Sequence, residues 1–279
     1  MRKIQKIFIT QPTIEGAGVY LKRGFSNREA ELFDPFLLFD DFSNIDSNLY
    51  KNGFPLHPHR GIETVTYILK GAVAHRDSLG SEGTIGAGDV QWMTAGSGIM
   101  HEEMPVAHTE GIQGFQLWVN LPRANKMMNP RYQEIKSNDI PTFNENGTEV
   151  KIIAGQYRDI QGPVKDLMVS TTYLDVTLSP LMSFSLMTHP EDNFFVYVIH
   201  GRLMVSDDRG EIWVEEGSIG LLSYDTQFSC TAGKEGVRFL LIGGKPIREE
   251  MIGHGPIVMN TREEIETALT ELNSGTFIK

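Results

Sequence analysis

The stretch Glu63-Thr-Val-Thr-Tyr67-Ile-Leu-Lys-Gly71 has a counterpart in the second half of the chain, Asn193-Phe-Phe-Val-Tyr197-Val-Ile-His-Gly201. Both stretches are rich in β-branched and aromatic residues and end at a glycine, which is typical of a strand that runs into a turn. Downstream, Ile85-Gly-Ala-Gly88-Asp-Val matches Val214-Glu-Glu-Gly217-Ser-Ile. The same order of strands and turns therefore occurs twice, which predicts two similar all-β halves.

The length of 279 residues is enough for two domains, and 40% hydrophobic with 22% charged residues is an ordinary globular composition. Turn-forming residues concentrate between 136 and 147, so we expect an N-terminal domain at 1–135, a linker at 136–147 and a C-terminal domain at 148–279. Helical periodicity is clearest at Thr261–Leu272, where Thr261 and Glu264 have the spacing of a capping box. We therefore predict a short C-terminal helix.

The formal net charge is −11, which disfavours direct contact with the phosphates of nucleic acid. We interpret the best basic clusters, Lys22–Arg23 and Arg123–Lys126, as solvated turns. The single cysteine, Cys230, allows no disulfide within the chain, which is typical of a reducing compartment. No apolar run approaches the ~18 residues of a membrane span. We expect a cytoplasmic monomer that is not embedded in a membrane.

Two short motifs place potential metal ligands at alternate positions. His57-Pro-His59 carries two imidazoles, and His101-Glu-Glu103 carries an imidazole and a carboxylate. Residues i and i+2 of a strand point to the same face, so each pair shares one face. On neighbouring strands the four donors would converge. Such a set suits iron(II), nickel(II), manganese(II), copper(II) or zinc(II), and it leaves two positions of an octahedral metal open.

Two longer segments around these motifs closely resemble the signature of the pirin family, a branch of the cupins. They are Gly53-Phe-Pro-Leu-His57-Pro-His59-Arg60-Gly61-Ile-Glu63 and Gly88-Asp-Val-Gln-Trp92-Met-Thr-Ala-Gly96-Ser-Gly98-Ile-Met-His101-Glu-Glu103-Met-Pro105. The resemblance continues at residues 114–121 and 254–261. It implies two tandem cupin barrels (jelly-roll, double-stranded β-helix) with one metal in the N-terminal barrel, commonly iron. The family's ligands correspond to His57, His59, His101 and Glu103. Cobalt is a further metal that this set of ligands would accept.

Glu63 can be interpreted in three ways. The general cupin pattern uses a glutamate four residues after its two histidines as a ligand, whereas the pirin resemblance assigns the carboxylate to Glu103, and we follow the latter. Glu63 would then orient a ligand imidazole or bind Arg60. As an ordinary strand residue it would simply pair with Arg60. We name Phe54, Arg60 and Gln116 as further candidates for the substrate pocket.

The second half of the repeat lacks most of these donors. The counterparts of His57, His59 and Glu63 are Met187, His189 and Asn193, and those of His101 and Glu103 fall near Cys230 and Ala232. We therefore expect a degenerate C-terminal barrel without metal, in which Cys230 is a small buried hydrophobic residue. Of the remaining histidines, we expect His75 to be solvated at the surface.

The resemblance implies a metal-dependent quercetin 2,3-dioxygenase, an oxidoreductase that cleaves a flavonol ring with O2 and releases carbon monoxide. The partners would be a small aromatic substrate and O2, and Glu103 would accept the proton of the substrate hydroxyl. The alternative is a non-enzymatic, redox-sensing regulator that acts through protein partners, as a transcription co-regulator or a modulator of a metabolic enzyme. Loss of flavonol absorbance indicates the enzyme, and a partner bound in one iron oxidation state indicates the regulator.

Overall fold

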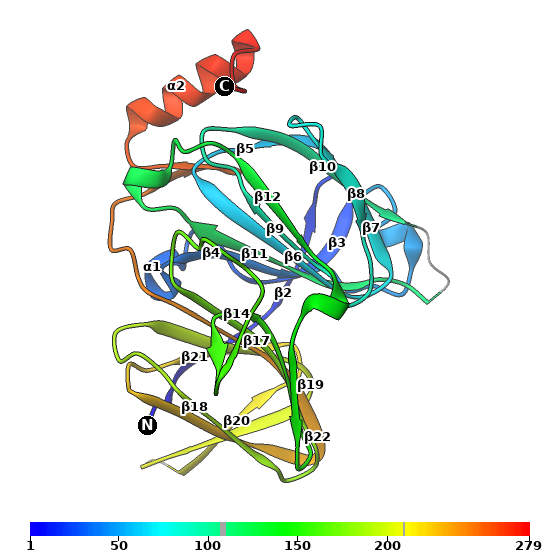
Figure 1. The fold of residues 1–279 in the computed structure, drawn as a ribbon, viewed down its shortest axis with the longest axis vertical. Coiled ribbons are helices and arrows are strands. Elements are labelled where there is room, and N and C mark those ends of the chain that lie inside the picture. Colours follow the sequence, from blue (N-terminus) through cyan, green and yellow to red (C-terminus); the bar gives the residue numbers. More distant parts are fainter. Residues whose placement is uncertain (107–109, 209) are drawn as a thin grey trace. The chain divides into compact units, whose positions relative to one another are not determined.

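The structure is a computed structural model that describes residues 1–106, 110–208 and 210–279, and β-strands are its main secondary structure (Figure 1). The chain divides into two compact units. The histidine unit comprises Gln11–Ala30, Phe36–Ser137 and Ile247–Lys279. The Cys230 unit comprises Met1–Thr10, Glu31–Pro35 and Asn138–Pro246. The predicted all-β fold class with one C-terminal helix is confirmed.

The histidine unit contains a seven-stranded sheet in the order β12-β9-β6-β11-β4-β3-β2 and a four-stranded sheet in the order β5-β10-β7-β8. Their strands are β2 (Gln11–Glu15), β3 (Val19–Phe25), β4 (Phe36–Asp41), β5 (Phe54–His59), β6 (Ile62–Lys70), β7 (Ala72–Asp77), β8 (Glu82–Ile85), β9 (Val90–Thr94), β10 (Ile99–Val106), β11 (Gln113–Asn120) and β12 (Arg131–Ile135). The central strands β6 and β9 are buried on both faces, which explains their nearly continuous apolar and threonine-rich sequences.

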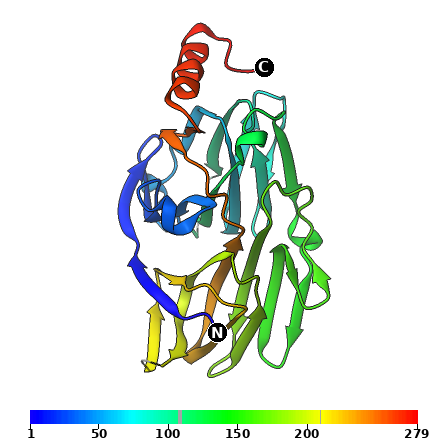
Figure 2. The ribbon, with the colours of Figure 1, turned by 90° about the vertical axis from the view of Figure 1, so that its left-hand side faces the viewer.

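The C-terminal segment belongs to the histidine unit, which differs from the domain that we expected at 148–279. It forms the hairpin β23 (Ile252–His254) and β24 (Ile257–Met259), followed by helix α2 (Arg262–Ser274) (Figures 1 and 2). The predicted capping box between Thr261 and Glu264 is present. The physical reason for the placement is an apolar cluster that includes Met259, Ile265 and Phe277 and packs against Met100.

The Cys230 unit contains a nine-stranded sheet with the main order β1-β21-β19-β22-β17-β14-β13, in which β18 pairs with β22 and β20 with β19. Its strands, with one small hairpin, are β1 (Ile4–Ile9), β13 (Thr142–Glu145), β14 (Thr148–Ala154), β15 (Gln156–Tyr157), β16 (Ile160–Gln161), β17 (Thr171–Leu178), β18 (Ser183–Met187), β19 (Asn193–Asp207), β20 (Gly210–Glu215), β21 (Ser218–Leu222) and β22 (Gln227–Gly244).

Short helical turns occur at α1 (Ala30–Phe33), η1 (Ser47–Leu49), η2 (Arg123–Asn125) and η3 (Ser137–Asp139). Among the described residues, none of the helices combines the length and apolar character needed to cross a bilayer.

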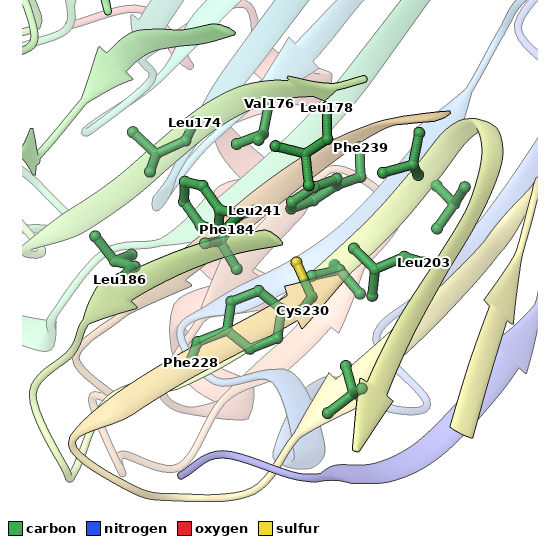
Figure 3. Packing of buried hydrophobic residues seen from close by; sticks show 14 of the residues in the cluster. Leu174, Val176, Leu178, Phe184, Leu186, Leu203, Phe228, Cys230, Phe239 and Leu241 are labelled. Atoms are coloured by element: carbon green, nitrogen blue, oxygen red, sulfur yellow. The ribbon is translucent and has the colours of Figure 1, made fainter. Parts of the chain in front are cut away.

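The interior of the Cys230 unit is filled by apolar side chains. Figure 3 shows the Cys230 sulfur among Phe184, Phe228 and Leu203, all of which belong to one buried cluster. The expectation that Cys230 is a buried small hydrophobic residue is thus confirmed, and burial raises the pKa of its thiol. Met187, the counterpart of His57, is 72% exposed. The positions that would face a metal in the first barrel here carry core residues or lie at the surface.

Arg2 precedes strand β1, which pairs with β21 in the Cys230 unit. Its buried guanidinium donates to Thr188 Oγ1 at 2.7 Å, to the Ser223 carbonyl at 2.9 Å and to the His189 carbonyl at 2.6 Å. It also lies over the ring of Phe194, 4.6 Å from its centroid.

We expect Arg2→Met to lower the free energy of unfolding by about 2–4 kcal/mol, because three part-buried acceptors lose a charged donor. Urea denaturation measures the loss. Lys3→Met is the control, since Lys3 is exposed and its ion pair with Asp208 lies in solvent, where such pairs contribute about 0–1 kcal/mol. Equal stability of the Arg2 variant and the wild type would contradict this role.

Candidate metal centre

The two histidine motifs lie on neighbouring strands of the four-stranded sheet. Strands β5 and β10 are antiparallel, and His101 lies directly opposite His57. A shift of register between His101 and Glu103 places Glu103 opposite Phe54. The alternation within each strand and the pairing between the strands together gather the four side chains on one face.

The three imidazoles form a compact cluster. Their ring centroids are 4.4 Å apart for His57 and His101, 4.8 Å for His57 and His59, and 4.9 Å for His59 and His101. One ring nitrogen of each lies within 4.8 Å of those of the other two. The Nε2 atoms of His57 and His59 are 3.0 Å apart. Two nitrogens that bind one metal at about 2.1 Å and at right angles are separated by about 3 Å, so this spacing fits a shared cation.

A backbone contact fixes which nitrogen of His57 is available. Its Nδ1 lies 2.9 Å from the carbonyl oxygen of Pro55, and because a carbonyl only accepts, Nδ1 must carry the proton. The Nε2 atom then presents its lone pair to the cluster. This arrangement, in which the outer nitrogen bonds to the backbone and the inner one faces a metal, is common among metal-binding histidines.

Glu103 stands beside His101, with its Oε2 atom 4.0 Å from His101 Nε2. Its other oxygen, Oε1, lies 3.0 Å from the hydroxyl of Thr66 on strand β6. Burial raises the pKa of Glu103 to about 7, and the bond from Thr66 opposes that shift. A carboxylate in this place would gain from a nearby cation, which favours its charged form.

Burial also keeps the imidazoles neutral. It lowers the pKa of His57, and it lowers the pKa values of His59 and His101 well below the usual range, where the neighbouring imidazoles add to the effect. His101 Nε2 is buried and has no hydrogen-bond partner among the described residues. Leaving such an atom without a partner is costly, and a metal ion would supply one. Three neutral imidazoles with an adjacent carboxylate therefore fit a divalent transition metal.

Glu63 lies elsewhere in the barrel wall. Its carboxylate accepts hydrogen bonds from Trp92 Nε1 at 3.1 Å and from Thr94 Oγ1 at 2.6 Å, and it lies 3.8 Å from Arg131 Nη2. These contacts occupy both oxygens, and neither a ligand imidazole nor Arg60 is among them. Both donors, the Thr94 hydroxyl and the Trp92 indole, lie on the neighbouring strand β9, where Thr94 pairs in register with Glu63.

Arg60 differs from the expectation that it belongs to the pocket. Its buried guanidinium forms an ion pair with Glu271 at 2.7 Å, donates to the carbonyl of Phe277 at 2.9 Å and lies 4.1 Å from the centroid of the Phe277 ring. Arg60 comes directly after the end of β5, and these contacts direct its side chain to the C-terminal segment. Its contacts are with the C-terminal segment, and it is not among the residues that line the cavity described next.

The other two pocket candidates, Phe54 and Gln116, line a cavity of about 490 Å³ inside the histidine unit. His57, His59 and Glu103 lie in the same wall. The lining is mainly apolar. The ring of Trp118 stands edge-on to His59 at 5.4 Å between centroids, and the two planes differ by 89°. His57, His59 and Glu103 thus open onto a mostly apolar space, whereas His101 is not among the residues that line it.

His75 is buried, which contradicts its expected surface position. It lies opposite Glu103 in the pairing of β7 with β10, and its Nε2 is 2.7 Å from the Tyr132 hydroxyl. Sequence reasoning also missed Thr66 and Arg23 as cavity residues. Thr66 could have been found from the alternation of Thr64 and Thr66 in strand β6, whereas Arg23 gave no such signal.

Comparisons with known proteins identify the family. The pirin family model matches residues 18–119, and the model of the pirin C-terminal cupin domain matches residues 173–278. The chain belongs to the pirin family. Its fold is accordingly that of two cupin domains with a C-terminal helix, as expected.

Members of the pirin family match over nearly the whole chain. A pirin-like protein of Caulobacter vibrioides is 41% identical over 279 residues, and the alignment covers 99% of each of the two chains. The crystal structure of quercetin 2,3-dioxygenase from Acinetobacter baumannii is similar with a TM-score of 0.89 and 35% identity, covering 99% of this chain and 98% of that one. A pirin of Escherichia coli, crystallised with nickel(II), shares the fold at 21% identity and a TM-score of 0.66, covering 88% of this chain and 99% of that one.

Proposed function

We propose that the chain is a metal-dependent dioxygenase that cleaves quercetin or a related flavonol with O2. His57, His59, His101 and Glu103 would hold one divalent metal, with iron(II) as the native ion. The observation that carries this proposal is a cluster of three neutral imidazoles with the Glu103 carboxylate 4.0 Å from His101 Nε2, next to an apolar cavity that His57, His59 and Glu103 line. Similarity to the quercetin 2,3-dioxygenase of A. baumannii supports the choice of reaction class.

A metal bound by these four groups would supply open coordination positions and Lewis acidity for an enol-bearing substrate and O2. The residues of the chain do the rest. The three imidazoles would hold the ion beside the cavity. The Glu103 carboxylate, held by Thr66 at Oε1, is the group placed to accept the hydroxyl proton of the substrate.

The cavity supports an aromatic substrate in particular. Its volume of about 490 Å³ lies within the usual range for small-molecule sites. Phe54, Leu38 and Trp118 contribute apolar surface to its wall. These side chains would pack on the faces of a planar ring system and exclude bulk water from the reacting atoms.

The proposal predicts a specific reaction. Anaerobically prepared, iron(II)-loaded protein should consume quercetin when O2 is admitted, with loss of flavonol absorbance, uptake of one O2 per quercetin and release of carbon monoxide. Glu103→Gln should lower the rate by about 100-fold or more, because the amide has nearly the same shape but cannot accept the proton. Absorbance spectroscopy and an oxygen electrode measure both rates.

The identity of the metal is tested on the same preparation. Elemental analysis of protein purified without a metal-affinity tag should give about one transition metal per chain. Unchanged quercetin absorbance in protein that demonstrably carries this metal would refute the dioxygenase. Full activity of Glu103→Gln would refute the role of Glu103 while leaving the reaction class in place.

A further inference from the structure

A row of polar side chains crosses the wall of the cavity in the histidine unit. In the seven-stranded sheet, Thr66 pairs with Gln116, Gln116 with Asp40, and Asp40 with Arg23, on strands β6, β11, β4 and β3. All four side chains line the cavity. Residues paired across antiparallel strands point to the same face, so the four form one continuous row.

Apolar residues border this row on both sides. Trp118 and Leu38 are paired in the next row of the same face, and both line the cavity. On the opposite side of the polar row, Phe42 and Ile112 also line it. A flat ligand with polar groups in one line and apolar surface around them would match this pattern of the wall.

One end of the row meets the candidate metal ligands. The Thr66 hydroxyl lies 3.0 Å from Glu103 Oε1 and 2.7 Å from Gln116 Oε1. A hydroxyl carries one proton, so it satisfies only one of these oxygens as donor. Either Glu103 is protonated, or Gln116 presents its amide nitrogen to Thr66. In both cases Glu103, Thr66 and Gln116 form a linked chain.

The other end of the row is a fixed ion pair. Arg23 donates from Nε and Nη2 to the two carboxylate oxygens of Asp40, at 2.9 and 2.7 Å, and from Nη1 to Glu15 at 2.8 Å. Asp40 is only 5% exposed, which holds its orientation. These bonds use three of the five N–H groups of Arg23 and one lone pair on each Asp40 oxygen, so donors and acceptors remain for a ligand.

We propose that the Arg23–Asp40 pair is a specificity-determining subsite that binds a phenolic hydroxyl on the remote ring of the substrate. This deepens the proposed function and rests on it. Neighbouring strands are about 4.8 Å apart, so the row extends about 10 Å from Thr66 to Asp40 and about 14 Å to Arg23. That is the length of a molecule of two or three linked rings. A hydroxyl donates to Asp40 and accepts from Arg23, which selects it over a bare ring edge.

Two probes separate this subsite from the metal site. Quercetin and 3-hydroxyflavone share the 3-hydroxy-4-keto unit that binds metals, but only quercetin carries hydroxyls on its remote rings. Dissociation constants are measured without oxygen, on metal-loaded and on chelator-treated protein. We expect the wild type to bind quercetin about tenfold or more tightly than 3-hydroxyflavone, which is the effect of a hydrogen bond to a charged group.

The test variants are Asp40→Asn and Arg23→Gln. In each, the ratio of the affinity for quercetin to the affinity for 3-hydroxyflavone should fall close to one. The matched control is Asp175→Asn in the Cys230 unit. Asp175 is 2% exposed and accepts from Arg238 Nε at 3.0 Å and Nη2 at 2.7 Å, so it forms the same paired arrangement away from the cavity. It should lose comparable stability and keep the wild-type ratio.

Three outcomes are decisive for the subsite. A ratio that persists in both Asp40→Asn and Arg23→Gln overturns it, and so does a ratio that collapses equally in Asp175→Asn. A wild type that binds both probes equally also overturns it. Admission of oxygen then separates the two proposals. Tighter binding of quercetin than of 3-hydroxyflavone, without consumption of quercetin, would refute the dioxygenase and leave the subsite intact. Equal binding of the two flavonols with rapid consumption of quercetin would refute the subsite and leave the dioxygenase intact.

Discussion

His101→Ala should abolish both tight metal binding and dioxygenase activity, while the protein remains folded. The Nε2 atom of His101 is buried, has no hydrogen-bond partner in the described part of the chain and faces the other donors. If the binding free energy of about 10–16 kcal/mol that is typical of four-ligand sites is shared among the ligands, the loss of one is worth about 3 kcal/mol or more. That corresponds to a fall in metal affinity of about 100-fold or more.

Elemental analysis, metal titration and circular dichroism measure this result. His200→Ala is the matched control, because His200 is an exposed histidine of the Cys230 unit whose Nδ1 lies 3.1 Å from Glu216. The control should keep about one metal per chain and the wild-type rate. A stoichiometric, tightly held metal in His101→Ala would rule out the proposed ligand set.

Lys126→Met should be among the most destabilising single changes in the histidine unit. The Lys126 side chain is 1% exposed, and its ammonium donates to Asn120 Oδ1 at 2.7 Å and to the carbonyls of Gly61 and Val258 at 2.9 Å each. Methionine would fill much of the same volume but would leave these buried acceptors without a donor. We expect a loss of about 3–5 kcal/mol in the free energy of unfolding.

The position of these acceptors explains the size of the effect. Gly61 comes soon after strand β5, which carries His57 and His59; it has φ +76°, and a Cβ there would come within 2.0 Å of the Val258 carbonyl. Lys126 therefore joins the turn after His59 to the C-terminal segment. Urea denaturation measures the loss. The exposed Lys22→Met serves as the control and should change stability by about 0.5 kcal/mol or less.

The same variant gives a pH test. Burial lowers the pKa of Lys126 from 10.5 to about 7. Between these values the unfolded chain holds a proton that the folded chain has released, so this group makes stability rise with pH, by up to about 1.4 kcal/mol per unit. The stability of the wild type minus that of Lys126→Met should therefore increase from pH 7 to pH 10. A constant or falling difference would show that the buried amine keeps its proton.

Much of the candidate metal site could be predicted from the sequence, because the relevant information is local. Alternation along a strand places His57 with His59 and His101 with Glu103 whatever the rest of the fold does. The internal repeat and the capping box at Thr261 are equally local, and each led to the observed strands and helix. What these patterns left open was the pairing of β5 with β10, on which convergence of the two motifs depends.

Local patterns failed where a polar residue finds its partner far along the chain. We interpreted Lys22–Arg23 and Arg123–Lys126 as solvated turns, yet Arg23 lies in β3 at the cavity wall and Lys126 is buried. Arg60 follows the candidate ligand His59 in sequence, but its side chain contacts Glu271 of α2 and the carbonyl of Phe277. In each case the partner is an acceptor that only folding brings near, so composition and charge gave no sign of it.

The sequence by itself thus determined the all-β repeat, the C-terminal helix and the two pairs of ligand-type side chains, because each depends on periodicity within a few residues. The tertiary structure alone decided that the C-terminal segment joins the histidine unit, that Lys126 is buried and that Thr66, Gln116, Asp40 and Arg23 form one row. The physical reason is strand register. A shift of one residue turns a side chain to the opposite face, and register is fixed by packing and hydrogen bonds between segments distant in sequence.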